Sequence, residues 1–143
     1  MMISVYADGS SHSSGGRPGG WGFLVVGTNG IPLASGAGGH PETTNNAMEL
    51  TAIIRGLYAV RALWPKGLDL PLEVVSDSQY ALGMASGSYS PTRNQELVAE
   101  LRRLVVALQP KLRWVRGHNG DRWNERVDSL AKAAKQKTMK GNE

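Results

Sequence analysis

The chain has no cysteine among its 143 residues. This absence excludes disulfide bonds, thiolate nucleophiles and sulfur-ligated zinc or iron sites. It also has no apolar run near the length of a membrane span, and no basic stretch followed by an apolar core opens the sequence. We therefore expect a soluble cytoplasmic protein from a reducing compartment, with no membrane partner.

No charge of one sign dominates the sequence. Sixteen Lys and Arg against twelve Asp and Glu give a net charge of +4, which only weakly favours a polyanionic partner. Hydrophobic residues make up 41% and charged residues 20%, as in ordinary globular domains, so global disorder is excluded. We expect one monomeric domain spanning residues 1–143, with residues 135–143 as a flexible tail.

Hydrophobic periodicity predicts five strands and four helices. Asn29-Gly30 is typical of a hairpin turn between the second and third strands, and Pro32 favours an edge position for the third. The expected strands are Ile3–Ala7, Trp21–Val26, Ile31–Ser35, Leu72–Ser76 and Leu112–Val115, with helices over about 46–64, 79–85, 94–108 and 121–134.

The element order β-β-β-α-β-α-α-β-α predicts an α/β fold, a five-stranded mixed sheet flanked by helices. Asp8 follows the first expected strand and Asp77 follows the fourth. If these two strands are parallel neighbours, their carboxylates come together at one edge of the sheet.

Four acidic residues stand in otherwise apolar or amphipathic segments. Besides Asp8 and Asp77, they are Glu49 and Asp128, each in a helical stretch with an apolar residue, Ile53 or Ala131, three or four positions further on. An unpaired buried carboxylate costs several kcal/mol unless a proton, a cation or a metal neutralises it. The set therefore predicts a divalent-cation site. The alternative, for Asp8 and Asp77, is that they cap turns or helices.

Five segments in order make the chain resemble the type 1 ribonucleases H. They are Tyr6-Ala7-Asp8-Gly9-Ser10, Thr44-Asn45-Asn46-Ala47-Met48-Glu49-Leu50, Ser76-Asp77-Ser78-Gln79-Tyr80, Arg116-Gly117-His118-Asn119-Gly120 and Asn124-Glu125-Arg126-Val127-Asp128-Ser129-Leu130-Ala131. The resemblance covers about Ser4 to Ala134. It implies a ribonuclease H-like fold and an endonuclease that hydrolyses the RNA strand of RNA–DNA hybrids.

The resemblance also implies a mechanism with two metal ions. Asp8 would bridge both ions, Asp77 would share that work, and Glu49 and Asp128 would complete the separate coordination spheres. Carboxylate oxygens suit Mg²⁺, and Mn²⁺ could substitute. One ion would generate the nucleophilic water and the other would stabilise the leaving oxygen, giving 5′-phosphate and 3′-hydroxyl ends.

Other residues take their expected roles from the same resemblance. Asn45, Asn46 and Gln79 would contact the hybrid, and the 2′-hydroxyl is the group that distinguishes its RNA strand. Thr44 and Asn94 would hold a phosphate of the DNA strand. Helix capping is the alternative for Thr44, Asn45, Asn46 and Asn94. His118 would shuttle a proton or assist product release; the alternative is an exposed loop histidine.

The chain departs from the family pattern in three places. The loop after Asp8 lacks the usual Asn-Pro-Gly element and reads Ser13 to Gly19 instead. Glu42 stands where some members have arginine. Only Gly87 to Arg93 occupies the place of a basic helical extension. Charge for the hybrid would then come from Arg93, Arg102, Arg103, Arg116 and Arg122, with a solvated surface as the alternative for each.

Two further readings of the function stay open at the level of sequence. One is a hybrid-binding module, either inactive or acting as the nuclease part of a larger polymerase assembly; the complete set of four acids disfavours the loss of activity. The other is a nuclease of the transposase or integrase kind that cuts DNA, which Glu49 and Thr44-Asn45-Asn46 disfavour.

Overall fold

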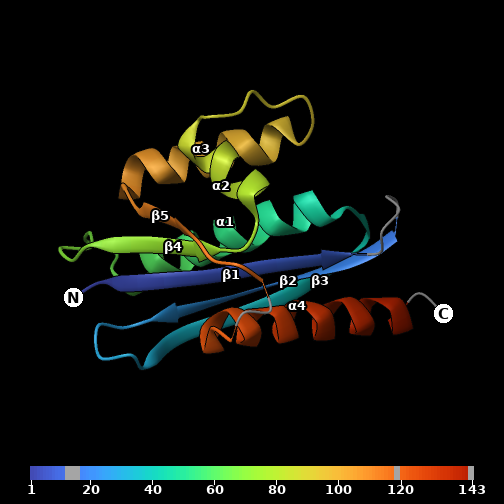
Figure 1. Cartoon of the computed structure of the whole chain (residues 1–143), viewed down its shortest axis with the longest axis horizontal. Coiled ribbons are helices and arrows are strands. Elements are labelled where there is room, and N and C mark those ends of the chain that lie inside the picture. Colours follow the sequence, from blue (N-terminus) through green and yellow to red (C-terminus); the bar gives the residue numbers. More distant parts are fainter. Residues whose placement is uncertain (12–16, 118–119, 142–143) are drawn as a thin grey trace.

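The computed structural model describes residues 1–11, 17–117 and 120–141. Five strands and four helices follow one another along the chain (Figure 1). They are β1 (Ile3–Ser11), β2 (Arg17–Val26), β3 (Pro32–Thr43), α1 (Asn45–Leu63), β4 (Leu72–Ser76), α2 (Gln79–Ser86), α3 (Gln95–Leu108), β5 (Lys111–Trp114) and α4 (Arg122–Gly141).

The five strands form one mixed sheet in the order β3-β2-β1-β4-β5. β2 pairs antiparallel with both β1 and β3, whereas β4 pairs parallel with both β1 and β5. The predicted α/β fold with a five-stranded mixed sheet is therefore confirmed, as is the parallel pairing of β1 with β4. Pro32 begins β3, which is an edge strand as its sequence indicated.

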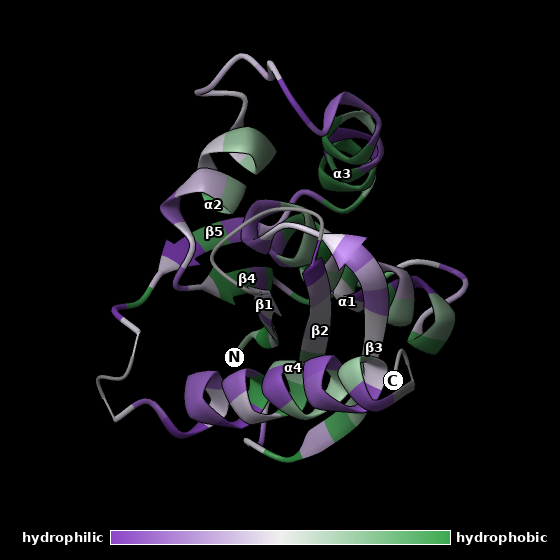
Figure 2. Ribbon diagram, turned by 90° about the vertical axis from the view of Figure 1, so that its right-hand side faces the viewer, coloured by the Kyte–Doolittle hydropathy of each residue, from purple (hydrophilic) through white to green (hydrophobic). Residues whose placement is uncertain are grey.

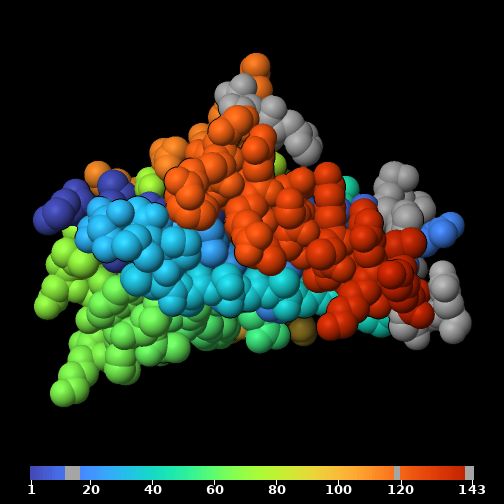
Figure 3. All heavy atoms as spheres, turned by 90° about the horizontal axis from the view of Figure 1, so that it is seen from below, coloured from blue at the N-terminus to red at the C-terminus, as the bar shows by residue number. Residues whose placement is uncertain are grey.

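Helices cover both faces of the sheet: α1, α2 and α3 lie on one side in Figure 1 and α4 lies on the other. Strand residues alternate between these faces. In β1, Val5 and Ala7 join the core beneath α1, whereas Tyr6 packs with Val127 of α4. Figure 2 shows α4 running across β2 and β3, and Figure 3 shows it (red) lying against β3 (cyan).

Three strand ends differ from the sequence prediction by more than one residue. β1 continues to Ser11, β2 begins at Arg17, and β3 extends to Thr43, although these added residues are rich in glycine and serine. Backbone pairing such as Ser10 with Gly20 and Trp21 with Gly38 carries the strands through positions of low strand propensity. Asp8 consequently lies within β1 and not beyond its end.

α4 also continues past Lys135, where the sequence pattern predicted the start of a polar tail. The Lys135 ammonium donates a hydrogen bond to the Ser10 hydroxyl at 3.2 Å, which ties this part of α4 to β1. Residues 135–141 are therefore helical. Among the described residues, no helix is both long and apolar enough to cross a bilayer.

Candidate metal site and nucleic-acid interface

Three carboxylates from separate parts of the chain converge at the parallel pair β1–β4. Asp8 comes from β1, Asp77 directly follows β4, and Glu49 lies in the second turn of α1. Each offers one oxygen within 4.8 Å of the others. The structure thus brings together three of the four acids that the sequence singled out.

The fourth acid, Asp128, reaches the group from α4 on the other side of the sheet. Its carboxyl lies close enough to Asp8 to raise the pKa of that residue. Lys132, one helical turn further on, forms an ion pair with Asp128 at 3.1 Å. Asp128 therefore contacts the cluster at Asp8, although it lies outside the group of three whose oxygens approach one another within 4.8 Å.

Burial and mutual repulsion make it costly to ionise the carboxyl groups of this cluster. Asp8 is only 4% exposed, and burial, followed by the charge of Glu49, raises its pKa far above the usual range for aspartate. Burial raises the pKa of Glu49 as well, and the charge of Asp77 adds to this effect. Like charges this close cannot all ionise without a compensating cation.

Glycines allow the backbone to approach the acids closely. A Cβ at Gly9 would overlap the backbone of Met48 and Glu49, so the missing side chain lets α1 lie against β1. The Gly9 N–H donates a hydrogen bond to Glu49 Oε1. A Cβ at Gly117 would lie 2.9 Å from Asp77 Oδ2, so a larger residue here would require the carboxylate or the loop to shift.

Ser78 links two parts of the site. Its hydroxyl oxygen accepts a hydrogen bond from the Ala81 N–H at 3.0 Å and so caps α2. The same side chain hydrogen-bonds to Glu49, which acts to lower the pKa of that carboxyl. The N-cap of the helix that follows Asp77 therefore also holds the acid that comes from α1.

The residues present fit a divalent cation of the Mg²⁺ type. Such ions prefer oxygen ligands, and carboxylates supply both the ligand atoms and the negative charge. The crowding that raises the pKa of Asp8 and Glu49 is relieved when a cation replaces their protons.

The predicted phosphate contacts lie around a separate pocket of about 260 Å³. Thr44, Asn46 and Asn94 line it together with Arg93, the one charged residue of the lining, and Glu42 is not part of it. Thr44 also caps α1 by accepting from the Ala47 N–H, so both of its expected roles are compatible with the structure.

The capping alternative fails for Asn94 and for Asn45. Asn94 precedes α3 with a left-handed backbone and no side-chain cap bond, and its amide donates to the Tyr80 hydroxyl at 3.2 Å. Asn45 Oδ1 accepts from the Ser11 N–H at 2.6 Å, which fastens the start of α1 to β1. Thr44, not Asn45, is the N-cap residue.

Three more predicted residues, Gln79, His118 and Arg102, have different outcomes. Gln79 is exposed at the start of α2, beside Asp77. His118 lies outside the described residues, as does most of the segment Ser13–Gly19. The Arg102 guanidinium is engaged within the protein: it donates to the carbonyl oxygens of Met84 at 2.8 Å and Tyr89 at 2.6 Å.

Sequence reasoning missed several residues of the site. Gly9, Ser78 and Gly117 lie inside the quoted motifs, but nothing in their residue type alone revealed their contacts with the acids. Trp114 was missed as well; its indole N–H donates to the Asp77 carbonyl oxygen at 3.1 Å. Asn124, one turn before Asp128, is 2% exposed, and its Oδ1 has no hydrogen-bond partner in the part of the chain that the structure describes.

Comparisons with known proteins agree with this geometry. The RNase H family model matches residues 2–136. The ribonuclease H of Pseudomonas paraeruginosa is 36% identical over 148 residues, which cover 91% of this chain and 90% of that protein.

Two solved structures share the fold at TM-scores of 0.80 and 0.81. They are the RNase H1 of the halophilic archaeon Halobacterium salinarum, 26% identical, and LC11-RNase H1 in complex with an RNA/DNA hybrid, 27% identical. Each alignment covers 96% of this chain and 99% of the other. The family match over nearly the whole chain, the shared fold and the convergent carboxylates lead to one conclusion: this chain is an enzyme of the ribonuclease H family.

Proposed function

We propose that the protein is an endonuclease that hydrolyses the RNA strand of RNA–DNA hybrids with the help of divalent metal ions. The convergence of Asp8, Glu49 and Asp77 within 4.8 Å carries the proposal, because this arrangement is costly without bound cations. Family membership and the likeness to an RNase H1 in complex with an RNA/DNA hybrid support the choice of substrate.

Asp8, Glu49, Asp77 and Asp128 would hold two Mg²⁺ ions, with Mn²⁺ able to substitute. When bound, the ions would lower the pKa of the attacking water and offset the charge of the leaving oxygen. Cleavage on the 3′-oxygen side of the phosphate would leave 5′-phosphate and 3′-hydroxyl ends.

The protein's own groups position the acids for this task. The Gly9 N–H and Ser78 hold Glu49, while the burial of Asp8 keeps solvent away from that carboxylate. The His118 imidazole would carry a proton between the site and solvent or assist product release, which its near-neutral pKa range suits. We expect the loss of His118 to slow the reaction less than the loss of a carboxylate.

Recognition of the hybrid would use two regions beside the acids. Thr44 and Asn94, with Arg93 in the same pocket, would hold a phosphate of the DNA strand. Asn45, Asn46 and Gln79 would contact the minor groove, where amides can read the 2′-hydroxyl of the RNA strand.

Cleavage of an end-labelled RNA–DNA duplex tests the proposal. We expect cleavage with Mg²⁺, none with EDTA, and a rate at least about 100-fold lower for Asp8→Asn, because a group that stabilises the reacting charge is removed. Phosphatase treatment and ligation of the fragments would identify their ends.

Asp69→Asn is the matched control, since Asp69 is exposed and lies outside every motif, in the loop before β4. It should retain full activity. All-DNA and all-RNA duplexes of the same sequence should stay intact. Undiminished cleavage by Asp8→Asn, or equal cutting of the all-DNA duplex, would contradict the proposal.

A further inference from the structure

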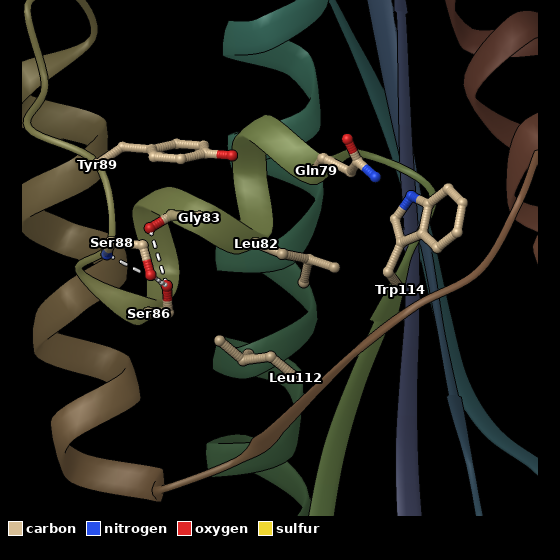
Figure 4. Close-up of a pocket in the computed structure, with 8 residues that line it drawn as sticks. All are labelled: Gln79, Leu82, Gly83, Ser86, Ser88, Tyr89, Leu112 and Trp114. Carbon is tan, nitrogen blue, oxygen red and sulfur yellow. Dashed lines mark hydrogen bonds between the residues drawn. The ribbon is translucent and has the colours of Figure 1, made fainter.

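A second cavity opens directly beside the carboxylates, between α2 and β5. We call it the α2–β5 groove; its volume is about 490 Å³, within the range of small-molecule sites. Its lining comprises Gln79, Leu82, Gly83, Ser86, Ser88, Tyr89, Leu112 and Trp114 (Figure 4).

Two exposed aromatic rings flank the groove on opposite sides, as Figure 4 shows. Tyr89 is 47% and Trp114 is 45% exposed. Large aromatic side chains that stay this exposed around one groove are typical of binding surfaces, because their apolar area is not buried in the core.

Both rings are held in place by the surrounding structure. The Tyr89 ring lies against Gly83, where any Cβ would overlap it, and Arg102 binds the Tyr89 carbonyl oxygen at 2.6 Å. The Trp114 indole is fixed by its 3.1 Å bond to the Asp77 carbonyl oxygen. Rings fixed in advance lose little conformational freedom when a ligand binds.

The polar groups of the groove indicate the chemistry of its ligand. Gln79 supplies an amide, which can both donate to and accept from a base edge, and Ser86 and Ser88 supply hydroxyls. None of the eight lining residues is charged, so the groove lacks the Arg or Lys that holds a phosphate. Exposed rings with amide and hydroxyl groups suit a nucleobase, which stacks on aromatic faces.

Two residues of the groove adjoin Asp77. Gln79 lies two residues after Asp77, and Trp114 is bonded to the Asp77 backbone. The inference rests on the proposed function, in which the RNA strand passes the carboxylates. A nucleotide that leaves the duplex there therefore belongs to the RNA strand. We propose that the α2–β5 groove binds an unpaired nucleotide of the RNA strand next to the hybrid, with its base stacked on Tyr89 or Trp114.

Fluorescence anisotropy on the cleavage-deficient Asp8→Asn protein tests this inference. The probes are a labelled blunt hybrid and the same hybrid with a short RNA or DNA overhang at either end. One RNA overhang should tighten binding about fivefold or more, since stacking of a base contributes roughly 1–3 kcal/mol. The ratio of overhang to blunt affinity is the readout, because general damage to the protein cancels in it.

Substitutions locate the effect. The double variant Tyr89→Leu/Trp114→Leu should abolish the overhang advantage. Gly83→Ala should weaken it without removing an aromatic ring, because the new methyl group displaces Tyr89 while alanine favours the helix. Tyr58→Leu is the matched control: Tyr58 is 42% exposed, lies on α1 and bonds to Glu100, so the advantage should persist.

Three outcomes would overturn the inference: equal binding of blunt and overhanging hybrids, an advantage that survives the double variant, or a DNA overhang that binds as well as RNA. Failure of the proposed function is recognised separately. In that case the unmodified protein would leave even the blunt hybrid uncut in Mg²⁺.

Discussion

Asp8 bears the greatest electrostatic cost of the residues in the site. It is almost fully buried, and Glu49, Asp77 and Asp128 all act to raise its pKa. Without metal, the folded protein therefore retains a proton on this cluster at pH values where the unfolded chain has released it. The stability of the metal-free protein must then fall as pH rises above about 4, the ordinary pKa of aspartate.

Asp8→Asn should stabilise the protein in the presence of a chelator. Asparagine keeps the shape of the side chain but never ionises, so the variant avoids the cost of charging the cluster. We expect a gain of about 1–3 kcal/mol in the free energy of unfolding at pH 8, since each unit of pKa shift corresponds to about 1.4 kcal/mol. Urea titrations from pH 4 to pH 8 in EDTA measure it.

The gain should shrink towards zero near pH 4, where Asp8 is protonated in both states of the parent protein. Asp69→Asn, at an exposed position, should leave the unfolding free energy unchanged at every pH. A destabilised Asp8→Asn protein at pH 8 would show that the acids do not repel one another in the fold.

Gly117→Ala should impair activity more than stability. The added methyl group would stand 2.9 Å from Asp77 Oδ2, so the loop or the carboxylate must move. We expect the cleavage rate to fall about 10–100-fold, because small displacements of positioning groups cost that much. Gly27→Ala, in the β2–β3 turn, is the control and should keep its activity. Equal rates for both variants would refute the role of Gly117.

Residue types singled out four acids, of which three lie together in the fold, because a carboxylate among apolar residues violates a simple solvation rule. They did not reveal the groups that hold these acids. The contacts of Gly117 with Asp77 and of Ser78 with Glu49 join segments far apart in the sequence. Glycine and serine are common in loops of every kind, so their presence does not indicate such contacts. The role of His118 stays a prediction.

At the scale of whole elements, the sequence placed the helices better than the ends of the strands. Gly20 was expected in a loop, yet it lies in β2 together with Gly22, which the expected strand already contained. A Cβ at Gly20 would overlap the Ala131 carbonyl oxygen of α4, and one at Gly22 would lie 2.7 Å from Leu130 Cβ. These glycines allow a helix to lie close to the sheet. Strand propensity is a local property, so it does not reveal this long-range contact.

α3 stabilises the segment that replaces the basic extension through Arg102. We expect Arg102→Met to lower the free energy of unfolding by about 1–3 kcal/mol, because two backbone carbonyl oxygens lose a charged donor while the aliphatic part of the side chain is kept. Chemical denaturation of purified protein measures the change.

Arg103→Met provides the comparison, since Arg103 is the exposed neighbour on the same helix. Its effect should stay within about 0.5 kcal/mol, as for most surface substitutions. If both arginines matter equally, the bonds of Arg102 contribute nothing beyond general surface charge.

For the molecule as a whole, binding of cations should be coupled to folding. On the proposed function, Mg²⁺ would bind the gathered carboxylates of the native state and would find no such group in the unfolded chain. At a concentration about 100 times its dissociation constant, it should add about 2.7 kcal/mol to the free energy of unfolding. Thermal unfolding with increasing Mg²⁺ measures this.

The stabilisation should be larger at pH 8 than at pH 5, because protons compete with the cation for the cluster. Asp8→Asn should abolish most of it, whereas Asp69→Asn should leave it intact. An equal response of the parent and Asp8→Asn proteins would place the cation elsewhere.

The four acids come from elements on both faces of the sheet, and this has a consequence for the synthesis of the protein. Asp8, Glu49 and Asp77 belong to elements made early, but Asp128 sits on α4, which the ribosome makes after all the others and which must dock on the opposite face of the sheet. A nascent chain that has already formed β1, α1 and β4 therefore still has an incomplete set of ligands. On the proposed function, nuclease activity would begin only once α4 has been made and has docked, so a chain without α4 poses no hazard to nucleic acids nearby.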